Sequence, residues 1–305
     1  MPYPHFDALL AEAARLPPVS VAVVDATEEH VLRGACDAQA QGFLEPILIG
    51  DPTILEPLLR RLEQDCPAAR NAQIVAAASA EEAAELGVEL VEKGRAQALM
   101  KGHLHSDTFL HPILAKLRTK QRLSHVFVTD IDTYPKLLLI SDAAINISPD
   151  LATKAAILQN AIQLARILGV DEPKAAILSA VEVINPAIPS TIDAACLSKM
   201  ADRGQIEGAL VDGPLAFDNA ISKEAARIKG IRSSVAGDAD ILLVPDLVSG
   251  NILAKDLEYL AGASLAGIVL GAQVPIILNS RADPARARLV SAALVALIQH
   301  QEVKP

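Results

Sequence analysis

Residues 19–25 read Val-Ser-Val-Ala-Val-Val-Asp, a short and mostly apolar run that leads into a carboxylate. Eight further runs of this kind follow, and each precedes a polar residue by one or two positions. The runs are 19–24, 46–49, 96–100, 125–128, 136–140, 174–178, 208–211, 240–244 and 274–278. Continuous Val/Ile/Leu runs separated by stretches with helical spacing are typical of buried parallel strands. The sequence therefore predicts an α/β protein.

Nine strands are many for one open, twisted sheet, so we predict two lobes with mainly parallel sheets and a cleft between them. The first lobe takes residues 1–121 and 269–305, and the second takes residues 122–268. The strands at 125–128 and 136–140 are close enough in sequence to form an antiparallel hairpin. Ligands bind outside the carboxyl ends of parallel strands, so the polar residues at those ends are the first candidates for a functional site.

Three of the predicted helices have recognisable starts. Residues 27–42 form a helix with Thr27 as the N-cap and two acids, Glu28 and Glu29, in its first turn, where the helix dipole favours negative charge. Ser79 and Asp150 are the expected N-caps of helices over 80–93 and 151–168.

The composition argues against several partners and compartments. A net charge of −10 and only 3% aromatic residues do not suit a nucleic-acid groove, which needs clustered Lys and Arg and aromatic platforms. Cys36, Cys66 and Cys196 are far apart in sequence and form no CxxC pair, as is typical of a reduced, cytoplasmic protein. The N-terminus shows no basic segment leading into an apolar one, so we expect no signal peptide.

Residues 260–278 raise the question of a membrane span. They form 19 consecutive residues without a charge, and ~20 apolar residues cross a bilayer. However, the stretch is rich in Ala and Gly and contains Gln273 and Pro275, unlike a fully apolar span. We interpret it as a buried helix end and a turn, followed by the strand at 274–278, and expect no membrane partner.

Ser280 and Arg281 follow the last predicted strand and are the first candidates for chemistry. The guanidinium of an arginine offers a rigid fork of donors that suits phosphate or carboxylate oxygens. The alternative is a surface salt bridge between Arg281 and Asp283, and these residues alone leave both interpretations open.

Two strand-to-helix turns are further candidates for binding an anion. Ser249-Gly250-Asn251 enters a helix, where free N–H groups attract anions, and Lys255 lies one turn further on. Lys101-Gly102-His103-Leu104-His105-Ser106 is a similar turn after the strand at 96–100. The alternative for such turns is an ordinary capped helix start.

Metal and nucleophile sites have weaker sequence signals. His103 and His105 are two residues apart, but no HExxH pattern or nearby Cys/Asp set completes the ligands, so we predict no metal site. Asp130 and Asp132 could hold Mg²⁺, although a solvated loop is the favoured interpretation. Cys196 lies in a predicted helix, and nothing near it in sequence marks a catalytic thiol.

Dinucleotide and P-loop fingerprints are also missing, since no GxGxxG follows the first strand and no GxxxxGK[ST] occurs. The residues alone therefore indicate a two-lobed α/β protein whose cleft suits a phosphate-bearing small molecule.

Eight segments, in order over nearly the whole chain, resemble the phosphate acetyltransferase/phosphate butyryltransferase family, with a pattern closer to its butyryl-type branch and to the transferase half of fused hydratase–transferase proteins. The segments are Met100-Lys-Gly-His-Leu-His, His125-Val-Phe-Val-Thr-Asp, Ile140-Ser-Asp-Ala-Ala-Ile-Asn-Ile, Leu178-Ser-Ala-Val-Glu, Val211-Asp-Gly-Pro-Leu-Ala-Phe-Asp, Ala236-Gly-Asp-Ala-Asp, Pro245-Asp-Leu…Ser249-Gly-Asn and Ser280-Arg281.

This resemblance implies a reversible reaction in which acyl-CoA and phosphate give acyl phosphate and CoA. It also implies a fold similar to that of isocitrate and isopropylmalate dehydrogenases, and a homodimer formed through the second lobe. CoA or acyl-CoA and phosphate are then substrates, and no metal or tightly bound cofactor is expected.

The resemblance also assigns roles to the candidate residues. Arg281 holds the phosphoryl group, and Ser280 hydrogen-bonds the carbonyl or the thiol. The remaining substrate contacts are Ser249, Gly250, Asn251 and Lys255 as a second anion contact, and Lys101, Gly102, His103 and Ser106 on the opposite wall.

Two positions depart from the family pattern. Acetyl-type members carry an acid, the expected general base, seven residues after the Ser of the Ser-Arg pair, and here that position is Ala287. Asp283 is the candidate base in its place. Many members carry an Arg on the helix after the Lys-Gly turn, and His111 aligns with it here, either as a replacement phosphate contact or as a packing residue.

Two other functions remain as alternatives. One is a metal- and NAD(P)-dependent dehydrogenase of 2-hydroxy acids with a similar fold. The other, suggested by Ala287 and His111, is a catalytically weak module that binds CoA or acyl phosphate. The sequence does not set the length of the acyl chain.

Overall fold

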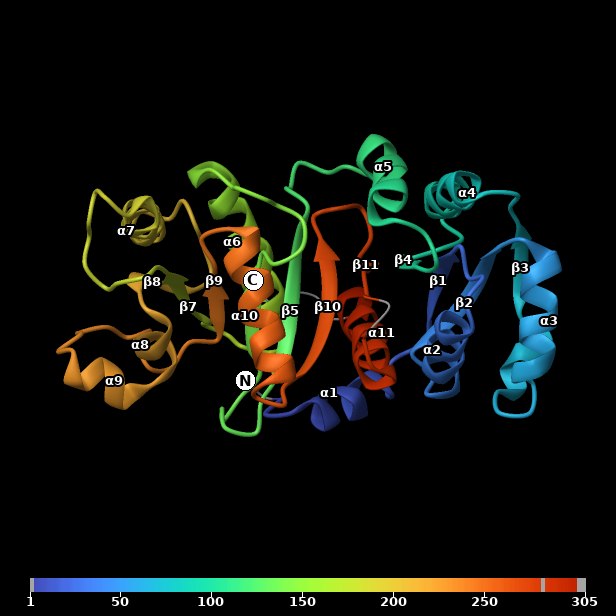
Figure 1. Cartoon of the computed structure of the whole chain (residues 1–305), viewed down its shortest axis with the longest axis horizontal. Helices are drawn as coiled ribbons and strands as arrows, with labels where there is room; N and C mark the ends of the chain where they lie inside the picture. Colours follow the sequence, from blue (N-terminus) through green and yellow to red (C-terminus); the bar gives the residue numbers. More distant parts are fainter. Residues whose placement is uncertain (1–2, 281–282, 301–305) are drawn as a thin grey trace. The chain divides into compact units, whose positions relative to one another are not determined.

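The computed structural model describes residues 3–280 and 283–300 and has an α/β fold whose strands are mostly parallel, as expected. The chain divides into two compact units, whose elements are labelled in Figure 1. Unit 1 comprises Arg122–Leu265 with the first residues of the chain, and unit 2 comprises Asp7–Gln121 with the segment from Ala266 onward. Unit 2 is therefore built from two separate stretches of sequence.

The strands of unit 2 follow the order β3-β2-β1-β4-β11-β10. They are β1 (Val19–Val24), β2 (Leu44–Gly50), β3 (Gln73–Ala76), β4 (Ala98–Lys101), β10 (Ser264–Leu270) and β11 (Ile276–Ile277). Neighbouring strands pair in parallel, except that β10 and β11 are antiparallel. Because β11 lies beside β4, the segment after β11 starts at the same edge of the sheet as the segments after β1 and β4.

Helices cover both sides of this sheet. They are α1 (Phe6–Ala13), α2 (Glu29–Ala40), α3 (Pro52–Leu62), the 3₁₀ helix η1 (Pro67–Asn71), α4 (Ala80–Glu92), α5 (Ser106–Lys116) and α11 (Ala285–His300). α2 packs against α11 on one side of the strands, and α4 packs against α5 on the other (Figure 1). The start of α2 and the start of α11 therefore belong to the same side of unit 2.

The strands of unit 1 follow the order β5-β6-β9-β7-β8. The strands are β5 (Ser124–Asp130), β6 (Leu138–Ser141), β7 (Lys174–Leu178), β8 (Leu210–Leu215) and β9 (Ile241–Leu243). β5 and β6 form the expected antiparallel hairpin, and the other neighbours are parallel. The helices of unit 1 are α6 (Leu151–Ile167), α7 (Pro189–Asp202), α8 (Phe217–Ile221), α9 (Lys223–Ile228) and α10 (Leu247–Tyr259).

Two of the three predicted helix caps are confirmed. The Ser79 hydroxyl accepts a hydrogen bond from the Glu82 amide of α4, and the Asp150 carboxylate accepts one from the Thr153 amide of α6. The prediction for α2 was wrong, because its N-cap is Glu28. Thr27 is occupied elsewhere, since its hydroxyl donates to the Asp25 carboxylate at 2.7 Å.

The interpretation of residues 260–278 was partly wrong. β10 occupies Ser264–Leu270, where we expected a helix end and a turn, and β11 covers only Ile276–Ile277. Both segments are buried apolar runs, and periodicity alone cannot separate a fully buried strand from a buried helix segment. Within residues 3–280 and 283–300, no helix combines the length and hydropathy that a bilayer crossing requires.

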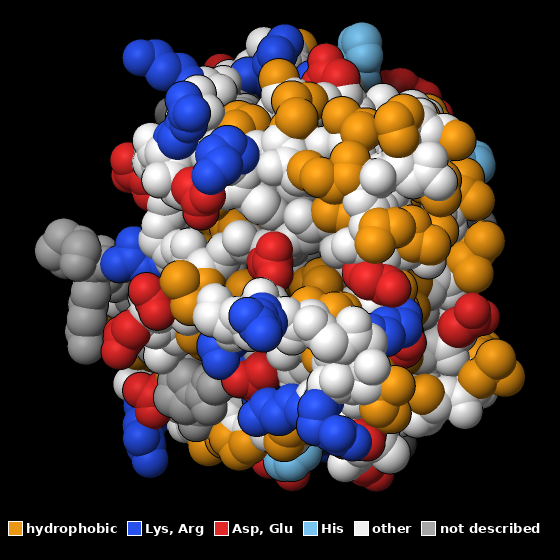
Figure 2. Space-filling view, turned by 90° about the vertical axis from the view of Figure 1, so that its left-hand side faces the viewer, with side chains coloured by type: hydrophobic (Ala, Val, Ile, Leu, Met, Phe, Trp, Pro, Cys, Tyr) orange, Lys and Arg blue, Asp and Glu red, His pale blue; other side chains and the backbone are white. Residues whose placement is uncertain are grey.

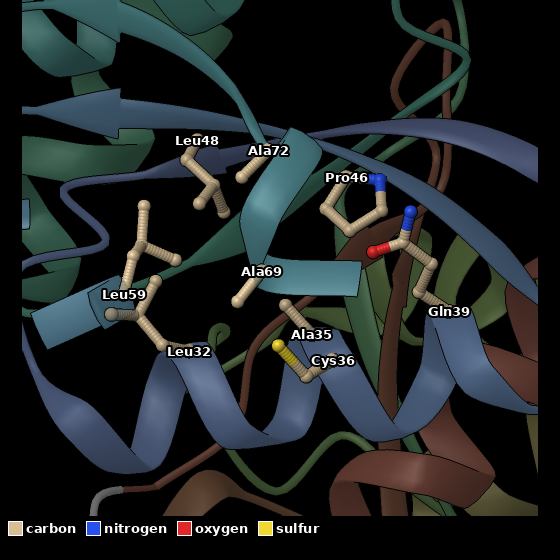
Figure 3. A pocket seen from close by; sticks show the side chains of 9 residues that line it. All are labelled: Leu32, Ala35, Cys36, Gln39, Pro46, Leu48, Leu59, Ala69 and Ala72. Carbon is tan, nitrogen blue, oxygen red and sulfur yellow. The ribbon is translucent and has the colours of Figure 1, made fainter. Parts of the chain in front are cut away.

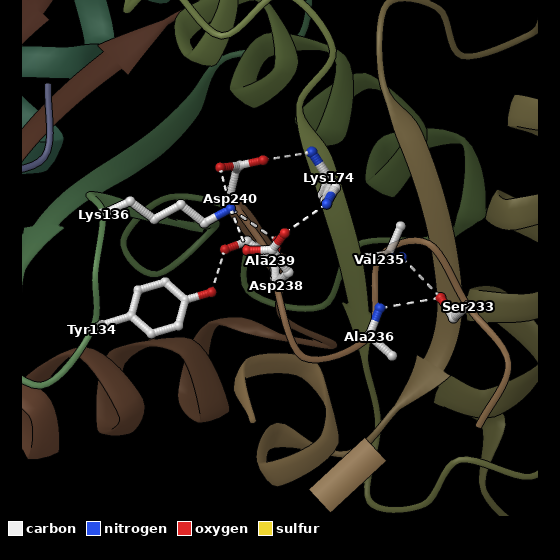
Figure 4. Close-up of polar contacts among 9 residues, drawn as sticks. All are labelled: Tyr134, Lys136, Lys174, Ser233, Val235, Ala236, Asp238, Ala239 and Asp240. Carbon is white, nitrogen blue, oxygen red and sulfur yellow. Dashed lines mark hydrogen bonds and ion pairs between the residues drawn. The ribbon is translucent and has the colours of Figure 1, made fainter. Parts of the chain in front are cut away.

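A buried charge cluster fixes the segment before β9 in unit 1 (Figure 4). The Lys136 ammonium lies 2.7 Å from the Asp240 carboxylate and 3.1 Å from that of Asp238. Lys174 approaches Asp238 at 2.6 Å, and its amide donates to Asp240. The Tyr134 hydroxyl donates to the Ala239 carbonyl at 2.6 Å. The Asp-Ala-Asp motif thus joins the starts of β6, β7 and β9.

We predict that Lys136→Met destabilises the protein by about 3–5 kcal/mol, because it leaves the buried Asp240 carboxylate without its cation. The Lys136 and Asp240 side chains are only 13% and 5% exposed. Chemical denaturation gives the free energy of unfolding. The matched control is Lys229→Met, which removes more exposed ion pairs to Glu182 and Asp218 and is expected to change stability by less than about 1 kcal/mol. Equal effects for the two variants would contradict the prediction.

A pH dependence follows from Asp238. Burial raises the pKa of its carboxyl, but hydrogen bonds and charge from Lys174 and Lys136 outweigh burial, so the net pKa lies below the ordinary value. A depressed carboxyl pKa stabilises the fold above the unfolded-state pKa of ~3.9, and this contribution disappears as the pH falls through the folded-state pKa. The stability difference between wild type and Asp238→Asn should therefore be constant above about pH 5 and shrink below about pH 4. A difference that persists at low pH contradicts this account.

Candidate active site

The ends of three neighbouring strands bring predicted site residues together in unit 2. β1 and β4 pair with Val24 opposite Lys101, and β4 and β11 pair with Met100 opposite Ile277. The strands are parallel, so the segments that follow them start at one edge of the sheet. Asp25, the Lys101 turn and Ser280 therefore share this edge, which is where ligands bind in such sheets.

The turns after β1 and β4 touch through their backbones. The Gly102 amide donates to the Val24 carbonyl at 2.8 Å, and the His103 amide donates to the Asp25 carbonyl at 2.7 Å. A Cβ atom on Gly102 would lie 2.1 Å from the Asp25 carbonyl oxygen, so only glycine fits. Asp25 itself has a φ of +55°, in the left-handed region that few non-glycine residues adopt. Backbone strain of this kind clusters at functional sites.

The loop after β11 is organised by Asp283. Its carboxylate accepts the Ser280 amide at 2.8 Å and the Asn279 side-chain amide at 3.3 Å. The Asn279 amide also donates to the Ser291 hydroxyl of α11 at 3.4 Å. Arg281 lies outside the described residues. The use of Asp283 as a general base stays a prediction, while its contacts show that it shapes the Ser280 loop.

A polar pocket opens at this edge of unit 2. It contains three predicted substrate contacts, Lys101, Gly102 and Ser280. The residues that line it are His30, Val31, Met100, Lys101, Gly102, Asn279, Ser280 and Arg288. The pocket therefore joins the start of α2, the end of β4, the loop after β11 and the first turn of α11.

Arg288 is a residue that sequence reasoning missed as a site residue. It is only 7% exposed, and its guanidinium donates to the Ser280 carbonyl at 3.3 Å. Burial lowers the pKa of Arg288, while the negative charges of Asp283 and Glu28 act in the opposite direction. The sequence signal that could have found it is its spacing from Ser280, since a side chain in the first turn of α11 can reach back to the preceding loop.

His30 and Asn279 were also missed. His30 lies in the first turn of α2, and Asn279 directly precedes the Ser-Arg pair. Asn279 Oδ1 and Glu28 Oε2 are buried acceptors without a hydrogen-bond partner. Buried polar atoms of this kind are rare in native proteins and call for an explanation.

Not every residue that we predicted from the Lys-Gly turn lines the pocket. The His103 imidazole pairs with the Glu28 carboxylate. Ser106 and His111 are exposed residues of α5 and do not line the pocket.

The second predicted turn lies in unit 1 and is held by internal contacts. Asp246 caps α10 by accepting the Ser249 amide at 2.8 Å, and the Ser249 hydroxyl lies 3.0 Å from the same carboxylate. The Asn251 side-chain amide donates to the Ala143 carbonyl at 3.3 Å. Gly250 has no room for a side chain, because a Cβ atom there would lie 2.9 Å from the Asp142 carbonyl oxygen.

Lys255 lies further along α10. Its ammonium is 2.7 Å from the Glu258 carboxylate and 5.6 Å from the centroid of the Tyr259 ring. The contacts of Ser249, Gly250 and Asn251 explain how the turn keeps its shape, and the role of this turn and Lys255 in substrate binding stays a prediction.

A second pocket in unit 2 is apolar (Figure 3). Cys36 of α2 points into it beside Leu32, Leu48 and Leu59. Burial, followed by a hydrogen bond with Cys66, raises the pKa of the Cys36 thiol to about 12. The thiol is therefore protonated at neutral pH, and this pocket lacks the thiolate that a nucleophile or metal site needs.

Within the described part of the chain, no group of three or more His, Cys, Asp or Glu side chains could hold a metal ion.

Comparisons with known proteins agree with the resemblance. Residues 71–296 match the family model described as phosphate acetyl/butaryl transferase. A phosphate acetyltransferase of Rickettsia prowazekii (strain Madrid E) is 50% identical, covering 97% of this chain and 85% of that protein. A phosphate butyryltransferase of Clostridium acetobutylicum is 42% identical, covering 91% of this chain and 92% of that protein.

Solved structures give the same result. The crystal structure of a branched-chain phosphotransacylase from Enterococcus faecalis V583 superposes with a TM-score of 0.81 at 31% identity, covering 93% of this chain and 100% of that one. The chain therefore belongs to the phosphate acetyl/butyryl transferase family.

Proposed function

We propose that the protein catalyses the reversible transfer of a short acyl group between CoA and phosphate, so that acyl-CoA and phosphate give acyl phosphate and CoA. The observation that carries the proposal is the polar pocket of unit 2, in which Ser280, the cation Lys101 and the buried Arg288 meet. Family membership supplies the reaction class, and the pocket supplies side chains suited to its charged substrates.

The chemistry requires both cations and hydrogen-bond donors. When acyl phosphate is the donor, the thiolate of CoA attacks the carbonyl carbon, and phosphate leaves with its negative charge. Cations and N–H groups placed where this charge develops stabilise the transition state. Lys101 and Arg288 bring positive charge to the pocket, and we propose that the hydroxyl of Ser280, which also lines it, binds the carbonyl or the thiol. We propose that Arg281 holds the phosphoryl group.

The direct test is phosphate-dependent formation of acyl phosphate, trapped with hydroxylamine, from acetyl-CoA and from butyryl-CoA. Relatives named for both acyl groups are similar to this chain, so the assay needs both substrates to find the preferred chain length. Activity below background with every short acyl-CoA would reject the proposal.

We predict that Arg281→Ala lowers turnover by roughly tenfold or more, because it removes a charge-assisted phosphate contact of ~2 kcal/mol. Steady-state kinetics in both directions measure the effect. The matched control is Arg286→Ala in the same segment, where the side chain pairs with Asp7 at 2.7 Å and is 49% exposed. If Arg281→Ala and Arg286→Ala behave alike, Arg281 has no special role in the reaction.

We also propose a homodimer that forms through unit 1. Large hydrophobic side chains that are exposed gather mainly in this unit, at Ile147, Val183, Ile184, Ile192, Ile228, Val248, Ile252, Tyr259 and Leu260. Figure 2, viewed from the side of α7–α9 in Figure 1, shows hydrophobic side chains clustered over part of that face. Apolar patches of this kind are typical of protein–protein interfaces.

We further propose a cytoplasmic location, which the three free cysteines fit.

Ile252→Glu, which places a charge on the exposed face of α10, is expected to shift the protein from dimer to monomer, because a buried unpaired charge opposes association. Light scattering during gel filtration measures the molar mass. Ile54→Glu in unit 2 is the control, since Ile54 is similarly exposed at 45%, against 56% for Ile252. A dimer that survives Ile252→Glu, or a wild type that is already monomeric, contradicts this assignment.

A further inference from the structure

Glu28 stands between two imidazoles at the entrance to α2. His103 Nδ1 pairs with Glu28 Oε1, and His30 Nδ1 lies 3.1 Å from Glu28 Oε2. Oε2 is buried and accepts no hydrogen bond, although it is this close to a ring nitrogen. A buried carboxylate oxygen is costly to leave unpaired, and His30 Nδ1 lies within ion-pair distance of it, without the geometry of a hydrogen bond.

His30 is also part of the candidate active site. It lines the polar pocket together with Lys101, Ser280 and Asn279, whereas His103 does not. Its side chain is 36% exposed, so a substrate group can reach it. The ring nitrogens lie on opposite sides of an imidazole, so contact with Glu28 through Nδ1 aims Nε2 away from the carboxylate. Catalytic triads likewise have a carboxylate beside Nδ1 of the histidine, where it sets the tautomer and the orientation of the ring.

The charges around His30 come from every element packed near it. Glu28 and Glu29 belong to the start of α2, and Glu29 is itself paired with Arg33 at 3.0 Å. Lys101 and His103 come from the turn after β4, Arg288 comes from the first turn of α11, and Asp283 comes from the loop before that helix. Charges of both signs thus face the imidazole, as a group that must gain and lose a proton requires.

The proposed reaction needs such a group. A free thiol has a pKa of ~8.5, so a base must assist its ionisation at neutral pH. The position that carries an acid in acetyl-type members is Ala287, which is only 4% exposed here. The Asp283 carboxylate already accepts hydrogen bonds from the Ser280 and Asn279 amides.

We propose that His30, oriented by Glu28, is the general base that takes the proton from the CoA thiol; the inference rests on the acyltransferase function proposed above. The S–H bond breaks and its proton moves to Nε2 of the imidazole. The thiolate then forms a C–S bond with the carbonyl carbon of acyl phosphate, and the C–O bond to phosphate breaks. The proton returns from Nε2 to an oxygen of the departing phosphate. His30 is the catalytic residue in this step, and Glu28 is a positioning residue.

The experiment measures kcat and KM for acyl phosphate and CoA as a function of pH in wild type, His30→Gln and Glu28→Gln. His30→Gln is expected to lower kcat by about 100-fold, the lower range for loss of a general base, with little change in KM for CoA. Glu28→Gln is expected to lower kcat less, by about tenfold, since the base is kept and only its orientation is lost. Wild-type kcat should fall on acidification through the range in which histidines ordinarily titrate, ~5–8, and this limb should vanish in His30→Gln.

His5→Gln is the matched control, because it breaks a pair of the same kind, His5 Nδ1 with Asp130 at 2.8 Å, and neither residue lines the pocket. Its kinetics should equal those of wild type. Added imidazole should restore part of the rate of His30→Ala, a readout that a merely structural role would not produce. A kcat within threefold of wild type in His30→Gln, or a change confined to KM for CoA, overturns the inference. An inactive wild type instead rejects the acyltransferase function itself, so the two failures are distinguishable.

Discussion

The backbone contact between the ends of β1 and β4 is the constraint on which the candidate site depends. Gly102 lies so close to the Asp25 carbonyl that no side chain fits between them. This contact places the Lys101 side chain and the His103 imidazole beside the start of α2, where Glu28 and His30 lie. Asp25 adopts a left-handed conformation at the same place. The polar pocket thus depends on two loops with an unfavourable backbone geometry, and the parallel strands that precede the loops impose this geometry.

The pocket also shows how an acidic protein can bring positive charge together in one place. The chain has a net charge of −10, yet Lys101 and the buried Arg288 both line this one concavity. Arg288 is held in place by the Ser280 carbonyl, and α2 makes room for it through Gly34, where a Cβ atom would lie only 3.0 Å from Arg288 Cδ. Net charge describes long-range steering and solubility, whereas affinity for phosphate depends on such individual contacts.

Much of the fold and the family could be predicted from the sequence, because buried strands and capped helices leave local signals. Val19–Val24 and Lys174–Leu178 have the predicted strand bounds, and the hairpin of β5 and β6 follows from their proximity in sequence. Two strands escaped prediction for different reasons. β3 is a short, partly exposed strand with little apolar pattern, and β10 is an apolar run that periodicity cannot distinguish from a helix.

The site was predictable only in part, because its residues meet through tertiary contacts. Lys101, Gly102 and Ser280 follow strands and were predicted from that position, and all three line the pocket. His30 and Arg288 lie on helices, and their importance appears only when α2 and α11 pack together at the pocket. The Cys36–Cys66 contact is similar, since thirty residues separate two cysteines that the fold brings together. The spacing of residues along the sequence does not predict such tertiary contacts.

The position of β11 has a consequence for how the protein is made. This strand lies between β4 and β10, within the sheet of unit 2, but it is translated after all of Arg122–Leu265. Domains generally fold as units during synthesis. Nearly the whole of unit 1 is therefore synthesised while unit 2 still lacks an interior strand, and the β4 edge of the first 121 residues stays uncovered until β11 has been made.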